Sequence, residues 1–222
     1  MDNLPLHRSI LAVDMERSTS PLRTNPIKGE LRGHVYRMLG QAMAHAGIGP
    51  RQCDPFEDRG DGVLALIQPD DGVPKTYLLS RLIPELARQL VDYNLSLPPD
   101  EWPRRGLRLR AVVHAGEIHR DPYGYFGEAL DVACRLLDAR PLKKCLENVP
   151  APLVLVVSEE IYQTIVKHGY DGISPETYQP DVRVKVAGRR RQGWIHVPTE
   201  ALRLAAEDPH FTTLPNRNPS AA

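Results

Sequence analysis

The chain has 222 residues, of which 41% are hydrophobic, and its 28 basic side chains balance 28 acidic ones. This length suits one full-sized domain core, and the charge balance argues against a global field that would hold the protein on nucleic acid or on an anionic membrane. No apolar run is long enough to span a membrane, and the first residues, MDNLPLHRSI, lack the positive start and the long apolar middle of a signal peptide. We therefore expect a cytoplasmic protein without nucleic-acid or membrane partners.

Apolar runs and helical patterns alternate along the chain. Runs of branched apolar residues predict buried strands, and apolar residues three and four apart predict helices. The strands are expected at 8–14, 62–67, 107–118 and 151–158, the helices at 29–48, 75–93, 126–139 and 159–168, and a hairpin at 181–198. Ser158 stands where it can cap the helix that follows it.

The order of these segments indicates the fold class. Strand and helix alternate four times before the hairpin, which a mixed, mainly antiparallel sheet with helices packed on it would satisfy, so we expect an α+β protein. Residues 1–206 are expected to form a single domain. From residue 207 to residue 222 the sequence has little periodicity, and we expect a flexible tail there.

Two carboxylates mark the ends of the first two predicted strands. Asp14 ends the first strand and Asp61 precedes the second, so antiparallel pairing of these strands would bring the two side chains together. Like charges that close need a cation between them, and hard oxygen ligands without histidine or cysteine nearby suit Mg²⁺ or Mn²⁺. The alternative is that Asp61 belongs to an ordinary Asp-Gly turn and that Asp14 caps a helix.

Charged residues of the later segments form a second group of candidates. Asp131 and Arg135 are four residues apart on one predicted helix and share a face, where they could form a simple helix salt bridge. The last hairpin has a basic turn, whose members are Lys185, Arg189, Arg190 and Arg191. Such a run is usually just a solvated turn. Separated cations combined with two acidic metal ligands are, however, what a polyphosphate substrate requires.

Three blocks of the sequence, in order over roughly residues 8 to 140, share features with a known family. They are ILAVDMERST, FEDRGDGVLALI and LRLRAVVHAGEIHRDPYGYFGEALDVACRLLDA. They resemble, in turn, the opening strand with the first metal aspartate, the block with the second aspartate, and the strand, hairpin and helix with the ribose-binding and transition-state residues of the class III nucleotidyl cyclases. This family includes adenylate and guanylate cyclases. The resemblance implies the family's fold, with a ferredoxin-like palm core.

The resemblance also implies a metal and phosphate site. Asp14 and Asp61 would hold two Mg²⁺ or Mn²⁺ ions per active site, one to activate the ribose 3′-hydroxyl and one to bind the triphosphate. The carbonyl of Met15 lies where the family binds metal and phosphate, and so do the backbone amides of the next four residues, which are Glu16, Arg17, Ser18 and Thr19.

Residues of the predicted helix and of the last hairpin would complete this site. Arg135 falls on the family's arginine that stabilises charge on the α-phosphate as pyrophosphate leaves, and Asp131 falls on an asparagine position that orients the ribose. Lys185, Arg189 or one of their basic neighbours would supply a phosphate-binding cation. The family's sites lie between two domains arranged head to tail. Because one chain has both sets of residues, the resemblance implies a homodimer with sites at the interface.

Glu57 and Gly124 occupy positions that select the base in this family. Adenylate cyclases place a lysine at the first position and often an aspartate at the second, whereas an ionised glutamate only accepts hydrogen bonds. On a strand, Glu57, Arg59 and Asp61 would share a face, with Glu57 toward the base pocket. Adenine is therefore the least favoured base. The alternative is that Glu57 points to solvent and pairs with Arg59.

In character, the altered base pocket resembles the pyrimidine (uridylate and cytidylate) cyclases of bacterial antiphage signalling. The expected reaction converts UTP to cyclic UMP, or CTP to cyclic CMP, and releases pyrophosphate, and a separate cyclic-nucleotide effector would read the product. One alternative is a guanylate or adenylate cyclase. Another is a cyclase-like domain that binds nucleotide with little catalysis, which the negative charge of Asp131 would favour.

Overall fold

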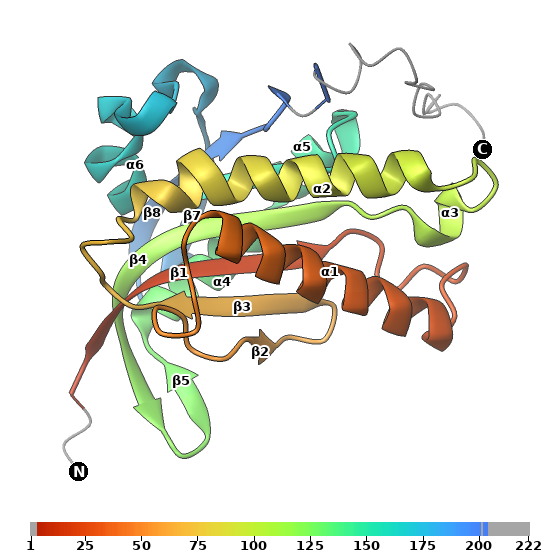
Figure 1. Ribbon diagram of the computed structural model, residues 1–222. Coiled ribbons are helices and arrows are strands. Elements are labelled where there is room, and N and C mark those ends of the chain that lie inside the picture. The colour runs from red at the N-terminus through yellow and green to blue at the C-terminus, as the bar shows by residue number, and fades with distance from the viewer. Residues whose placement is uncertain (1–3, 201, 204–222) are drawn as a thin grey trace.

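A computed structural model describes residues 4–200 and 202–203 of the chain (Figure 1). Its centre is an eight-stranded sheet with the order β2-β3-β1-β4-β6-β8-β7, in which β5 pairs with β4. The strands are β1 (Leu6–Met15), β2 (Glu57–Asp58), β3 (Gly62–Ile67), β4 (Leu109–Asp121), β5 (Gly124–Phe126), β6 (Leu153–Ser158), β7 (Gln179–Val186) and β8 (Arg189–His196). Every neighbouring pair is antiparallel except β4 and β6, which are parallel. The expected α+β fold with a mixed, mainly antiparallel sheet is confirmed.

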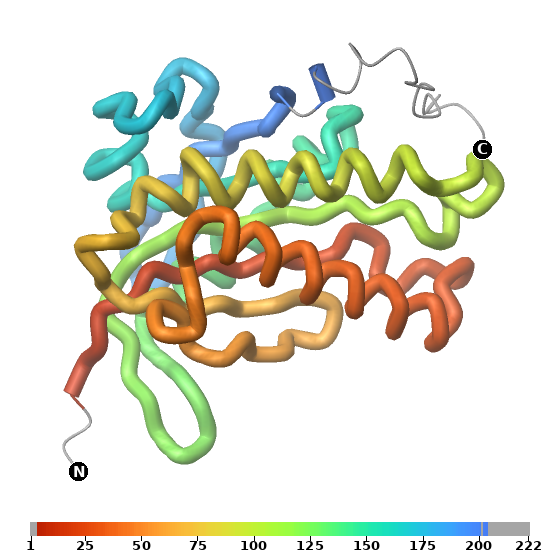
Figure 2. The backbone as a smooth tube through the Cα atoms, viewed as in Figure 1, coloured from red at the N-terminus to blue at the C-terminus, as the bar shows by residue number. Residues whose placement is uncertain are grey.

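Helices cover both faces of this sheet. They are α1 (Asn25–His45), a π-helical turn (Leu78–Leu82) that leads into α2 (Ile83–Ser96), α3 (Trp102–Arg105), α4 (Glu128–Leu137), α5 (Arg140–Asn148) and α6 (Glu159–Thr164), followed by 3₁₀ turns at Val166–His168, Tyr170–Gly172 and Pro175–Thr177. The tube in Figure 2 shows the β4–β5 hairpin projecting beyond the body of the sheet. None of the described helices is long and apolar enough to cross a membrane.

The alternation of side chains along β1 separates two cores. Leu11 and Val13 pack in the cluster that contains α1 and α2, whereas Ile10 and Ala12 pack in the cluster that contains α4 and α5. The next residue of the second series is Asp14, so its side chain lies on the α4 face of the sheet, at the end of the strand.

Two helices differ from their predicted bounds because of proline. Helix α1 begins at Asn25, not at residue 29, because Pro26 occupies its first turn, where a missing N–H is tolerated. The helix expected at 75–93 is interrupted by the π-helical turn. Pro84 cannot donate the α-helical hydrogen bond to the carbonyl of Ser80, and the irregular turn lies next to it.

Three further predictions concern the second half of the chain. The helix predicted at 159–168 ends as an α-helix at Thr164, and Ser158 caps it as expected by accepting a hydrogen bond from the Ile161 amide. Helix α5 was not predicted from the sequence. The proposed domain end at residue 206 and the tail at 207–222 lie outside the described residues.

Candidate active site

The two predicted metal-binding carboxylates lie at one end of paired strands. Strands β1 and β3 are antiparallel, as expected, and Asp14 is opposite Gly62, the residue after Asp61. The Met15 amide donates to the Asp61 carbonyl over 3.2 Å. A Cβ on Gly62 would lie 2.5 Å from the Val13 carbonyl oxygen, so only glycine lets the turn come this close to β1.

Each carboxylate has a polar partner. Arg110 is directly opposite Asp14 on β4 and donates through Nη2 to Asp14 Oδ2. The side chain of Asp14 is 20% exposed. Asp61 is exposed and accepts a hydrogen bond from the Ser18 hydroxyl. The Arg110 guanidinium therefore offsets part of the negative charge at the end of the two strands.

Two cavities, each of about 330 Å³, flank Asp61 and share four lining residues, namely Met15, Ser18, Thr19 and Asp61. The first is also lined by Lys28 and Arg32 of α1, and the second by Arg110 and Lys143. The sequence interpretation missed these four cations. Lys28 and Arg32 are four residues apart, the spacing of one helix face, but the predicted helix began after Lys28.

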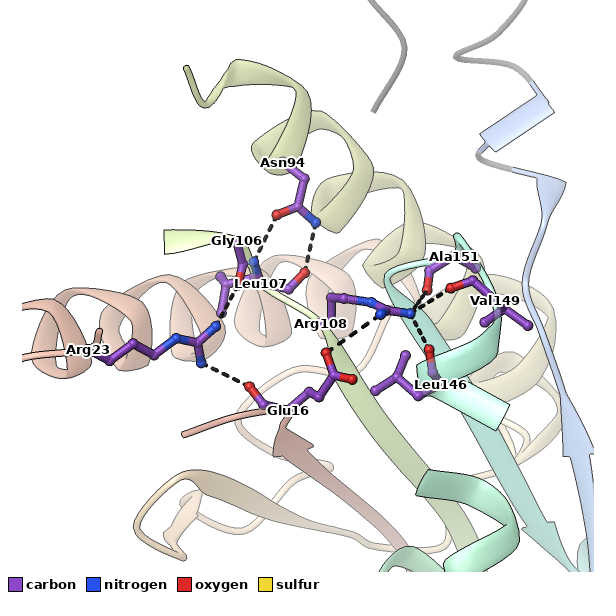
Figure 3. A network of polar contacts seen from close by, with 9 residues as sticks. All are labelled: Glu16, Arg23, Asn94, Gly106, Leu107, Arg108, Leu146, Val149 and Ala151. Carbon is purple, nitrogen blue, oxygen red and sulfur yellow. Dashed lines mark hydrogen bonds and ion pairs between the residues drawn. The ribbon is translucent and has the colours of Figure 1, made fainter. Parts of the chain in front are cut away.

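The segment after Met15 does not present all of its side chains to these cavities in the same way. Arg17 and Thr19 are exposed, and Ser18 is half-buried. The Glu16 carboxylate points into the protein, where its Oε2 lies 3.6 Å from Nη1 of the buried Arg108 (Figure 3). The Glu16 amide donates to the Arg108 carbonyl over 2.9 Å, so that amide is already used within the fold.

The structure brings together the predicted base-selecting residues. Glu57 lies opposite Leu64, whose side chain packs in the cluster that contains α4. The Glu57 carboxylate is 2.6 Å from Arg59 Nη2, and its Oε1 would be 3.7 Å from a Cβ on Gly124 of β5. The Glu57 side chain is 24% exposed, so the ion pair with Arg59 forms without turning Glu57 fully to solvent.

Asp61 does not share a strand face with Glu57 and Arg59, contrary to the prediction. Strand β2 ends at Asp58, and a turn follows in which Gly60 has a φ of 80° and the Arg59 amide donates to the Gly62 carbonyl. A glycine tolerates this positive φ, which reverses the chain before Asp61. Asp61 is therefore presented by the turn at the end of the sheet.

The candidate residues of α4 lie on its exposed side. Among the described ion pairs none joins Asp131 to Arg135, so the simple helix salt bridge is not formed. Desolvation raises the pKa of the Cys134 thiol between them; Arg59 and Arg135 oppose this rise and Asp131 adds to it. The charge of Arg59, in the β2–β3 turn, therefore acts on the Cys134 thiol of α4.

The basic hairpin lies at the other end of the sheet from Asp14. Met15 is opposite Leu109, which is opposite Leu153 at the start of β6, whereas Gly193 is opposite Ser158 at the end of β6. Strand β8 begins at Arg189, four residues before Gly193, so the turn that joins β7 to β8 lies still further from Asp14. Lys185 and Arg189 are exposed at this turn. One chain thus does not bring these two cations to the carboxylate pair.

No protein-family model matches the chain, and no curated protein matches it. Several solved structures do. An adenylate/guanylate cyclase/hydrolase from Silicibacter pomeroyi is 21% identical, with a TM-score of 0.60 over 88% of this chain and 98% of its own. The adenylyl cyclase CyaB from P. aeruginosa is 13% identical, with a TM-score of 0.59 over 89% of this chain and 96% of its own. The guanylyl cyclase Cya2 is 14% identical, with a TM-score of 0.59 over 96% of this chain and 100% of its own.

These likenesses establish the fold. The chain has the mixed α+β fold of the class III cyclases, with an open sheet and helices on both faces. Within this fold, Asp14 and Asp61 lie at one end of the central strands. Glu57 and Gly124 lie close to each other, and Glu57 is opposite Leu64, whose side chain packs in the cluster that contains α4.

Proposed function

We propose that the protein is a nucleotidyl cyclase, which converts a nucleoside triphosphate to a 3′,5′-cyclic nucleoside monophosphate and pyrophosphate. The observation that carries this proposal is the register that places Asp14 opposite Gly62, next to Asp61, in a class III cyclase fold. In the reaction the ribose 3′-hydroxyl gives its proton to water, and its oxygen attacks the α-phosphorus. The bond between the α-phosphorus and the bridging oxygen breaks, and pyrophosphate leaves with that bond's electron pair.

The donor set fits two Mg²⁺ or Mn²⁺ ions. Asp14, Asp61 and the Met15 carbonyl offer oxygen ligands only, which suits hard cations that keep water and bind together with substrate phosphates. Among residues 4–200, 202 and 203 no group of three His, Cys, Asp or Glu side chains could form a closed metal cage. Such ions, when bound, lower the pKa of the 3′-hydroxyl and neutralise phosphate charge.

A homodimer would supply the remaining cations. Lys185 and Arg189 lie at the end of the sheet opposite Asp14, so a second copy in the reverse orientation is needed to bring such cations to the carboxylate pair. In this arrangement Arg135 of the second copy stabilises charge on the α-phosphate, and Asp131 lies near the ribose. Two equivalent sites then form at the interface.

The base is proposed to be a pyrimidine, with UTP or CTP as substrate. Glu57 accepts a hydrogen bond from the uracil N3–H or the cytosine amine, and Arg59, held beside it at 2.6 Å, donates to a ring carbonyl. Gly124 adds no competing side chain. The cyclic product would act as a second messenger for a separate effector in antiphage defence.

Guanylate cyclase activity is the second candidate. The same Glu57–Arg59 pair offers an acceptor for the guanine N1–H and N2–H and a donor for O6. Adenine has neither a Watson–Crick ring N–H to donate to Glu57 nor a ring carbonyl to accept from Arg59, so ATP is the poorest match for this pair.

One assay tests the proposal directly. The purified protein is incubated with Mn²⁺ and all four ribonucleoside triphosphates, and the cyclic products are separated. We expect cyclic UMP or cyclic CMP from the unaltered protein and no cyclic product from Asp61→Asn. Cyclic GMP alone would establish the second candidate, turnover of ATP alone would contradict the base assignment, and nucleotide binding without any cyclic product would contradict the activity.

A further inference from the structure

The residue after Met15 is held at three of its polar groups by two arginines. The Glu16 amide donates to the Arg108 carbonyl over 2.9 Å, and the Glu16 carbonyl accepts from Arg23 Nη1 over 2.9 Å. The Glu16 carboxylate lies 3.6 Å from Arg108 Nη1. Figure 3 shows Glu16 between the two guanidinium groups. This contact set fixes both the backbone and the side chain of a single residue.

Both arginines are anchored in other parts of the fold. Their exposures are only 6% for Arg23 and 4% for Arg108. Arg23 also donates from Nη2 to the Gly106 carbonyl over 2.7 Å. Arg108 Nη2 donates to carbonyls in the last turn of α5 and in the α5–β6 connection, which belong to Leu146, Val149 and Ala151. The two side chains therefore tie the segment after β1 to the start of β4 and to the end of α5 (Figure 3).

Stability alone is a weak reason for this arrangement. Burying charges is unfavourable, and ion pairs in protein interiors often stabilise no better than apolar residues of the same shape. The guanidinium contacts instead define geometry. The two terminal nitrogens of Arg23 reach different carbonyls, and in Arg108 one terminal nitrogen faces the Glu16 carboxylate while the other donates to backbone carbonyls. The backbone conformation that these contacts can fix is that of Arg17, the residue after Glu16.

Arg17 has a φ of 58°, in the left-handed region that non-glycine residues rarely adopt. A conformation of this kind persists only where the surroundings determine it. Directly after it, the Ser18 hydroxyl donates to Asp61 Oδ2, and the Ser20 amide donates to the Arg17 carbonyl over 3.0 Å. The left-handed conformation of Arg17 thus links Glu16, which the two arginines hold, to Ser18, which contacts Asp61.

We propose that Arg23 and Arg108 are positioning residues for the metal end of the site. Their contacts with Glu16 hold the backbone of Arg17 in its left-handed conformation and thereby place the Ser18 hydroxyl in contact with Asp61. This inference rests on the proposed function, in which Asp61 is a metal ligand. The Glu16 side chain, which also lines the second cavity, then acts on the site through its contact with Arg108.

The test is binding of Mn²⁺ alone, followed by electron paramagnetic resonance, in the unaltered protein and in Arg23→Lys. A lysine keeps the charge, but its single ammonium cannot reach the Glu16 and Gly106 carbonyls as two separate nitrogens do. We expect Mn²⁺ affinity to fall about tenfold, as when a group that orients a metal ligand is lost. Amide hydrogen exchange at Ser20 should become faster in the same variant. Arg104→Lys, the same change at an exposed position of α3, should alter neither measurement.

Mn²⁺ affinity and Ser20 exchange that stay within twofold of the unaltered protein in Arg23→Lys would overturn the inference, even if the melting temperature fell. If Arg23→Lys does not fold, Glu16→Gln takes its place, because it keeps the backbone contacts and removes only the charge that faces Arg108. The expected change is then a smaller one in the same direction, and no change would overturn the inference. Failure of the unaltered protein to bind Mn²⁺ would contradict the proposed function, whereas Ser20 exchange would still decide the role of Arg23.

Discussion

The carboxylate of Glu57 faces Gly124, and its Oε1 is 3.7 Å from the position that a Cβ on this glycine would occupy. The two residues come from β2 and β5; in the order of the sheet, β2 lies on one side of the β1–β3 pair, and β5, through its pairing with β4, lies on the other. Because Gly124 has no side chain, the polar groups of the predicted base pocket come from Glu57 and Arg59, whose Oε2 and Nη2 atoms are 2.6 Å apart. Base choice should therefore depend on Glu57 more than on any other residue here.

Glu57→Lys should shift the substrate preference toward ATP. The change replaces an acceptor by a donor, and mismatched buried polar groups discriminate by roughly ten- to a hundredfold. The measurement is the ratio of kcat/KM for ATP to kcat/KM for the natural substrate. Asp58→Asn is the control, because Asp58 lies on the other face of β2 and pairs with Arg32 at 2.6 Å. An unchanged ratio in Glu57→Lys would show that Glu57 does not contact the base.

Asp61→Asn should remove Mn²⁺-dependent cyclisation while leaving the apo protein folded. Loss of a direct metal ligand should lower kcat by more than about 100-fold, since even a group that only orients a ligand can cost that much. The melting temperature in EDTA should change by less than about 2 °C, because exposed substitutions are typically worth up to roughly 0.5 kcal/mol. Asp92→Asn, at an exposed position of α2, is the control for charge. A large loss of stability in Asp61→Asn would indicate a structural role only.

Much of the fold could be predicted because local patterns and burial agree along most of the chain. The apolar runs before Asp14 and after Asp61 are both strands, and their pairing follows from the need to bury both faces. Helix α5 was missed because its apolar residues are few: within Arg140–Asn148 the buried ones are Leu142 and Leu146. A pattern of two residues is too short to separate a helix from a loop.

The contacts of the candidate site that depend on the register of distant strands could not be predicted from local patterns. Arg110 was not predicted as the partner of Asp14, because their relation depends on the register of β1 against β4. The distance of Lys185 from Asp14 depends on the registers of four successive strand pairs. Arg108 and Glu16 contact each other across a long stretch of chain, and no local pattern signals such a pair.

Gly62→Ala should destabilise the protein and disturb the carboxylate pair. The new Cβ would lie 2.5 Å from the Val13 carbonyl oxygen, and overpacking of this kind costs about 1–3 kcal/mol. The measurement is the free energy of unfolding in urea. Gly33→Ala is the matched control, because its Cβ would meet nothing within 4 Å on α1, and the change should stabilise by about 0.5–1 kcal/mol. Equal effects of the two changes would contradict the close approach of β3 to β1.

His114 should make the protein less stable as the pH falls below about 6.5, the ordinary pKa of histidine. The side chain is buried and its Nδ1 lies 2.8 Å from the Ser158 hydroxyl. Burial lowers its pKa; Glu160 opposes this shift, and Arg191 and His7 add to it. Because the folded pKa lies below the unfolded one, the unfolded chain binds more protons between the two values. The stability that neutral His114 contributes is thus fully present above pH 6.5 and is lost as the pH drops toward the pKa of the folded state.

The free energy of unfolding, measured in urea at several pH values between 7 and 5, checks this expectation. One proton of difference between the folded and unfolded states gives a slope of at most about 1.4 kcal/mol per pH unit. His114→Asn keeps a polar group near Ser158 but does not titrate, so its slope should be shallower whatever its absolute stability. His168→Gln, at an exposed position, should keep the slope of the unaltered protein. If His114→Asn and the unaltered protein gave parallel curves, the acid sensitivity would have to come from another group, such as His196, whose pKa burial also lowers.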